Sequence, residues 1–146
     1  MSSNSSTEPR PGAPAVATQL TSAFDFLACE VPAAHTEMAR RLGERRVRIR
    51  VDNETFDVAA LRGLVRVCVP EGDPPVAIDT SRALVRQVLA GACSLEQALR
   101  DDRLRARGAL RDLVAVLSAL EAFIHGAVRC EAMPKLFDEF QTEKVA

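Results

Sequence analysis

The stretch that decides the fold covers residues 80–120 and reads TSRALVRQVLAGACSLEQALRDDRLRARGALRDLVAVLSAL. It predicts a helix that ends at Gly91, a short helix, a strand with alternating arginines, and a long amphipathic helix after Gly108. Ser94 and Gln97 have the spacing of a capping box, so the short helix is expected to begin there. Nothing in this stretch has the pattern of a nucleophile, a metal cluster or a phosphate loop. Its apolar residues are expected to form one apolar face, which makes the chain a candidate for binding a hydrophobic molecule in its interior.

The residues before this stretch predict helix and then strands. Apolar residues at helical spacing over 19–42 predict a helix that is kinked or restarted at Pro32. Strands are expected around 46–51, where arginine alternates with Val and Ile, and at three later segments. These three segments are residues 55–58, 64–69 and 76–78. Hairpin-linked strands with one polar face favour an antiparallel sheet that helices cover on one side only.

The two ends of the chain have a different composition from the middle. Residues 1–18 are rich in Ser, Pro, Gly and Ala and predict a disordered leader, so a single domain is expected over 19–146. The leader lacks a basic segment followed by an apolar one, and no run of eighteen apolar residues follows. We therefore expect a cytoplasmic protein with no transmembrane segment. After Pro134 a short amphipathic segment closes the chain.

Composition excludes several function classes. The chain has 146 residues, 47% of them hydrophobic, and a formal net charge of −1, which argues against a general nucleic-acid binder. The four cysteines form no CxxC pair, so we expect reduced thiols rather than two disulfides or a zinc site. No spacing of ligands indicates a metal, and no cofactor is expected. The cysteines are Cys29, Cys68, Cys93 and Cys130.

Seven arginines are expected on the open face of the sheet. This basic face admits two interpretations: a solvated outer face that is protected against edge pairing, or a plate that docks an acidic protein or an anionic membrane surface. The seven are Arg46, Arg48, Arg50, Arg66, Arg103, Arg105 and Arg107.

The order of these segments resembles the sterol carrier protein type 2 family. The runs that carry the resemblance are VRIRVDNETFDV, LVRVCV, PVAIDTSRALVRQVLAG and CSLEQALRDDRLRARGALRDLVAVLSAL, and it extends over roughly residues 20–130. It implies an α/β fold of the α+β type, with a five-stranded, mainly antiparallel sheet covered on one face by helices and an apolar cavity between the two. It also implies binding or transfer of a lipid, fatty acyl or similar hydrophobic ligand. Abundant Ala, Arg, Leu and Val suit a stand-alone member from a high-GC bacterium, which argues against a sterol.

The lining of such a cavity should come from the inner sheet face, the long helix and the last segment, where Phe137 and Phe140 could close one end. The candidate ligand-binding residues are Phe56, Val67, Leu84, Val88, Leu113, Leu117, Leu120, Phe123, Ile124, Phe137 and Phe140.

A catalytic use of the same cavity is the alternative. Glu121 and His125 stand four residues apart on the long helix and are the weak candidates for an oriented base; a surface pair is the simpler interpretation. A small secondary-metabolism enzyme, such as a cyclase or isomerase, would need one of these, Asp79 or a cysteine to point inward. The leading hypothesis is a binding protein without catalysis.

Overall fold

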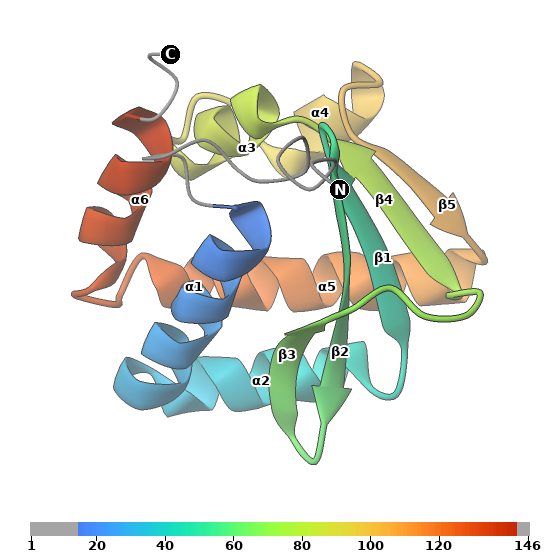
Figure 1. The fold of residues 1–146 in the computed structure, drawn as a ribbon, viewed down its shortest axis with the longest axis horizontal. Coiled ribbons are helices and arrows are strands. Elements are labelled where there is room, and N and C mark those ends of the chain that lie inside the picture. The colour runs from blue at the N-terminus through green and yellow to red at the C-terminus, as the bar shows by residue number, and fades with distance from the viewer. Residues whose placement is uncertain (1–14, 143–146) are drawn as a thin grey trace, which may run out of the picture.

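The structure is a computed structural model that describes residues 15–142, with the backbone alone at positions 89, 137 and 139–142. Two helices, four strands, two helices, one strand and two helices follow one another along the described chain, in the order expected from the sequence (Figure 1). They are α1 (Val16–Glu30), α2 (Pro32–Leu42), β1 (Arg46–Val51), β2 (Glu54–Leu61), β3 (Leu64–Cys68), β4 (Val76–Thr80), α3 (Arg82–Leu89), α4 (Leu95–Arg100), β5 (Arg105–Gly108), α5 (Leu110–Ala127) and α6 (Met133–Thr142).

The five strands form one mixed sheet in the order β3-β2-β1-β4-β5. Three of the neighbouring pairs are antiparallel and β1 runs parallel to β4, so the mainly antiparallel sheet predicted from the sequence is confirmed. Directly paired residues share a face, and Ile49 pairs with Ile78 while Arg50 pairs with Asp79. The sheet therefore has one apolar inner face and one charged outer face.

The helices cover the inner face. Figure 1 shows α5 running across behind the sheet with α2 beside it, while α1 lies against both. The helices approach closely because Gly126 has no side chain: a Cβ there would lie 2.6 Å from Ala34 Cβ and 2.7 Å from Leu27 Cδ1. The rings of Phe24 and Phe123 meet edge to face at 5.7 Å, which fixes α1 on α5. The apolar side of α1 is thus buried within its own chain.

Helix α1 begins at Val16, three residues before the start expected from the sequence. The Glu54 carboxylate accepts hydrogen bonds from the backbone N–H groups of Val16 and Ala17, at 2.8 and 2.9 Å. A carboxylate at a helix N-terminus accepts hydrogen bonds from the free N–H groups and interacts favourably with the positive end of the helix dipole. Because this cap is the first residue of β2, no sequence pattern near the helix predicts it.

The caps of α3 and α4 come from residues next to each helix, and the Ser94 cap of α4 was predicted from the sequence. Ser81 Oγ accepts from the Leu84 N–H, and Ser94 Oγ accepts from the Gln97 N–H, both at 3.1 Å. Between residues 15 and 142, no helix is both long enough and apolar enough to cross a membrane.

Candidate functional site: an apolar cavity between sheet and helices

A cavity of about 220 Å³ lies between the inner face of the sheet and the helices. Its wall on the sheet side consists of inward-facing residues of β1, β2 and β4, and helices α1 to α5 contribute the rest of the lining. The sheet contributes Val47, Ile49, Val51, Phe56, Val58, Ile78 and Thr80; the helices and the residue before β5 contribute Val16, Leu20, Phe24, Met38, Leu42, Leu84, Val85, Val88, Leu95, Leu104, Val116, Ala119, Leu120, Phe123 and Ile124.

The central strand shows how the cavity arises. Ile49 lies in the middle of β1, between β2 and β4, yet it is only half-buried because its side chain borders open space. A cavity of about 150 Å³ lined by such side chains is known to stay dry and to bind benzene. The present cavity is larger, so it can hold the apolar body of a small ligand.

Six of the predicted lining residues border this cavity. They are Phe56, Leu84, Val88, Leu120, Phe123 and Ile124. Val67 lies on the inner side of the edge strand β3 and packs against the core, but it does not border the cavity. The side chains of Phe137 and Phe140 are outside the described residues. A ligand-binding role for any of these residues stays a prediction.

Leu113 and Leu117 do not border the cavity because the buried face of α5 differs from the apolar stripe that helical spacing predicts. The predicted stripe consists of Leu110, Leu113, Val114, Leu117, Leu120 and Ile124. Leu110 and Val114, which belong to that stripe, are 76% and 58% exposed. The buried face instead consists mostly of small residues, which allow α2 to pack closely. The buried residues of α5 are Val116, Ala119, Ala122, Phe123, Gly126 and Ala127.

Most of the other lining residues were not predicted from the sequence, and two groups among them show why. Val47, Ile49 and Val51 alternate with arginines, and this alternation already marked them as the inner face of the sheet. The contribution of α1, through Val16 and Leu20, depends on how that helix is placed by the distant Glu54, and local sequence does not contain this information.

The candidate catalytic pair lies away from the cavity. Glu121 and His125 are both exposed on α5, and in the described part of the chain neither borders the cavity. Asp79 lies on the outer face of the sheet, where it pairs with Arg50 at 2.7 Å. No ionisable side chain occurs among the described lining residues.

The cysteines are free thiols at four separate positions. Burial, together with the nearby Glu30 carboxylate, raises the pKa of the buried Cys130 thiol, which makes it a poor nucleophile. Across residues 15–142, no group of three or more His, Cys, Asp or Glu residues is placed to hold a metal ion.

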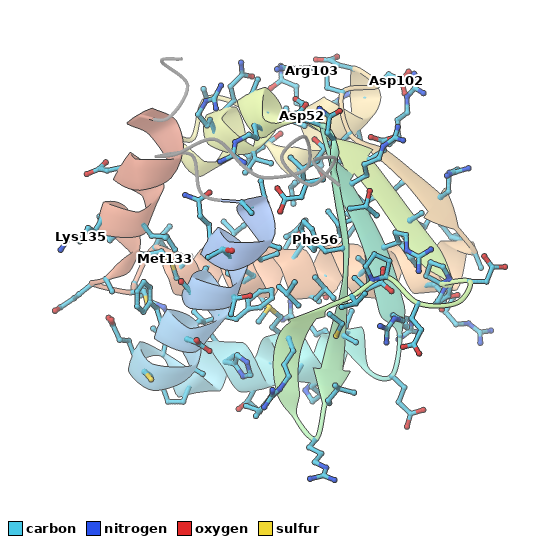
Figure 2. The ribbon with its side chains drawn as sticks, in the orientation of Figure 1. Asp52, Phe56, Asp102, Arg103, Met133 and Lys135 are labelled. Atoms are coloured by element: carbon cyan, nitrogen blue, oxygen red, sulfur yellow. The ribbon has the colours of Figure 1, made fainter. Side chains whose placement is uncertain are left out.

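Six of the seven predicted arginines share the outer face of the sheet through its register. Arg103 is the exception, because β5 begins only at Arg105 and Arg103 instead donates to Gln87 Oε1 on α3, at 2.7 Å (Figure 2). Acidic partners balance several members of the group: Arg50 pairs with Asp79, and Arg105 with Asp102. Docking of an acidic protein or a membrane surface on this face stays a prediction.

Arg46 and Arg48 hold a crossing loop rather than facing open solvent. The chain between β3 and β4 passes over the outer face (Figure 1), and the two guanidinium groups donate to its carbonyl oxygens. Both also bind Asp57, with Nε to carboxylate distances of 2.6 Å from Arg46 and 2.8 Å from Arg48. Burial alone would raise the pKa of Asp57, but the hydrogen bonds from Arg48, Arg46 and the Glu71 N–H outweigh it and lower that pKa.

Comparison of the sequence with family models and with curated proteins gives no match. Solved structures do match. A UbiJ-SCP2 ubiquinone synthesis protein aligns with a TM-score of 0.56 at 18% identity, over 73% of this chain and 95% of that one. Sterol carrier protein domain 2 of Helicoverpa armigera aligns with a TM-score of 0.57 at 12% identity, over 80% and 94%. Apo sterol carrier protein 2 of Yarrowia lipolytica aligns with a TM-score of 0.54 at 12% identity, over 81% and 94%.

At these identities the likeness establishes the fold alone. The chain has the fold of sterol carrier protein 2 domains, and the fold that the sequence resemblance implied is confirmed.

Proposed function

We propose that this protein binds a hydrophobic small molecule in the cavity and sequesters or transfers it. The single observation that carries the proposal is the apolar cavity between β1, β2, β4 and the helices. The names of the matched structures add support, since sterol carriage and ubiquinone synthesis both involve apolar molecules. A lipid, an acyl chain or a polyketide- or terpenoid-like ring system has the required chemistry.

The driving force would be the apolar surface that the ligand removes from water. A ligand that buries about 250 Å² would gain about 6 kcal/mol at roughly 25 cal/mol per Å². A free energy of about 6 kcal/mol corresponds to a dissociation constant of about 40 μM. Lost translational and rotational freedom opposes this gain, so a ligand that buries only this area is expected to bind no more tightly than that, and tighter binding requires a ligand that buries more apolar surface.

We favour binding over the cyclase or isomerase alternative. General acid–base catalysis needs a titratable group within hydrogen-bond reach of the substrate. The described lining provides none, and the candidates Glu121 and His125 are exposed on α5.

A substitution on α5 that fills part of the cavity tests this proposal. Ala119 is buried and borders the cavity, so Ala119→Phe places a ring in the space that a ligand would use. We expect the affinity for a fluorescent fatty acid, measured by titration, to fall by about tenfold or more, which corresponds to about 1.4 kcal/mol.

Ala115→Phe is the matched control. Ala115 lies one turn earlier on α5, is half-buried and does not border the cavity, so this variant should bind the probe like the original protein. Thermal unfolding of both variants shows that each is folded. Unchanged affinity of a folded Ala119→Phe variant would contradict the proposal.

A further inference from the structure

The β2–β3 hairpin carries two exposed leucines at its tip. Leu61 and Leu64 are directly paired, so their side chains lie next to each other on the outer face of the sheet. They are 50% and 43% exposed, and the two residues between them are exposed as well. Figure 1 shows the turn projecting beyond α2 at the bottom of the view. The tip is thus a protruding apolar pair that the described chain covers only in part.

Two arginines accompany the leucines. Arg62 lies in the turn itself, and Arg66 follows on β3, on the same face as Leu64 because side chains alternate along a strand. Both arginines are exposed, and no residue that the structure describes pairs with either guanidinium. Arg46 and Arg48 of the same face, by contrast, are bound to a carboxylate. Arg62 and Arg66 are therefore available to bind an anion from outside the chain.

The backbone at Arg62 is unfavourable for an arginine. The turn has two central residues, Arg62 and Gly63, with φ of +56° and +80°, as in a type I′ turn. Such turns favour Asn or Asp before the glycine, because these residues tolerate a positive φ better than a long side chain does. The other non-glycine residues with positive φ between residues 15 and 142, Asp52 and Asp102, are aspartates. Arg62 thus makes the turn less stable, which indicates a role for its side chain outside the turn.

We propose that the tip of the β2–β3 hairpin docks the protein on the surface of a membrane that contains anionic lipids. Leu61 and Leu64 enter the boundary between headgroups and acyl chains, where apolar side chains leave water. Arg62 and Arg66 bind the lipid phosphate groups around them. The inference goes beyond the proposed function, because the tip shares no residue with the described cavity lining.

The shape of the tip favours a membrane over an acidic protein. A narrow turn offers far less area than the roughly 800 Å² that each partner of a specific protein complex buries. A membrane needs no complementary surface, since a few apolar side chains insert and nearby arginines add electrostatic attraction. Two leucines with two arginines give weak and reversible attachment, so the protein returns to solution readily.

The test is sedimentation of the full chain with vesicles of phosphatidylcholine alone or mixed equally with phosphatidylglycerol. The original protein should bind the mixed vesicles at least about tenfold more tightly than the neutral ones, and added salt should weaken this binding because it screens the arginines. Leu61→Ser combined with Leu64→Ser removes the apolar part of the tip. This double variant should bind the mixed vesicles at least about tenfold more weakly than the original protein.

Arg62→Asn separates a docking role from a structural role. Asn is favoured at this turn position, so the melting temperature should stay the same or rise. The affinity for mixed vesicles should nevertheless fall about fivefold, the contribution of about one arginine near an anionic surface. A melting temperature that falls would show that the folded chain already uses the guanidinium, and an unchanged affinity would show that the membrane does not; either result overturns the inference.

Arg107→Asn and Leu110→Ser are the controls for charge and for apolar exposure. Arg107 is exposed on β5, at the opposite edge of the same sheet, and Leu110 is 76% exposed on α5. Each variant should bind mixed vesicles like the original protein. If Arg107→Asn loses as much affinity as Arg62→Asn, or Leu110→Ser as much as the double leucine variant, the contact does not lie at the tip and the inference fails.

The vesicle assay and the fatty acid titration separate this inference from the proposed function. Ala119→Phe fills the cavity and should still bind mixed vesicles, whereas the double leucine variant should still bind the fluorescent fatty acid. If the original protein binds the fatty acid but no vesicle, or binds both kinds of vesicle equally, the inference is overturned and the proposed function stands.

Discussion

At the scale of single residues, Asp57 is a buried carboxylate that binds two arginines and a loop on the outer face of the sheet. It lies on the outer face of the sheet, where solvent is expected, yet it is 0% exposed. The crossing loop and the side chains of Arg46 and Arg48 enclose it. The alternating arginines of β1 therefore hold the β3–β4 connection in place as well as forming a soluble surface.

Asp57→Asn should destabilise the fold by about 2–4 kcal/mol, because the amide keeps the shape but cannot satisfy two guanidinium groups. Urea unfolding at pH 7 measures the loss. Asp79→Asn is the control, since that carboxylate forms an exposed pair with Arg50 and should cost less than about 1 kcal/mol. Equal losses in the two variants would contradict the role assigned to Asp57.

At the scale of elements, His35 joins α2 to the edge strand β3. It is buried, and its Nε2 accepts a hydrogen bond from the Val65 N–H at 3.3 Å, which requires the neutral ring. Burial lowers the pKa of His35, and the nearby Asp25 carboxylate opposes this only partly. The folded protein thus binds a proton at this site less readily than the unfolded chain does.

Linkage turns this lowered pKa into a pH dependence of stability. A histidine whose pKa is lower in the folded state contributes stability that is lost as pH falls below its unfolded value of 6.5. His35→Gln keeps an acceptor for Val65 but does not titrate, so the drop in melting temperature between pH 7.5 and pH 5.5 should shrink. The exposed His125, the other histidine of the chain, gives the control His125→Gln, which should leave the drop intact. The opposite pattern would contradict the assignment.

The elements also show what the sequence could predict. Strands, turns and serine caps followed from short patterns, because each depends on neighbouring residues. The buried face of α5 did not follow from such a pattern. Ala119, Ala122 and Gly126 are small and only weakly hydrophobic, and they are buried because α2 packs there. The start of α1 was missed for a related reason: its cap, Glu54, lies 38 residues further along the chain.

At the scale of the whole molecule, the fold class and the existence of an apolar cavity were predictable, and most of the residues in its wall were not. The cavity is lined by elements that meet only in three dimensions: α1 from the start of the chain, the central strands, and α5 from its end. Periodicity tells which face of an element is apolar, but it does not tell whether that face packs tightly or borders open space. Val67 and Leu113 pack against the core, whereas Ile49 borders the cavity.

The most direct test of the account is native mass spectrometry of the freshly purified full chain, followed by solvent extraction and identification of any bound molecule. We expect a stoichiometric adduct that Ala119→Phe loses, and an extracted molecule with an apolar body. A clean ligand-free mass, together with no binding across a panel of fatty acids, esters and terpenoids, would contradict the account.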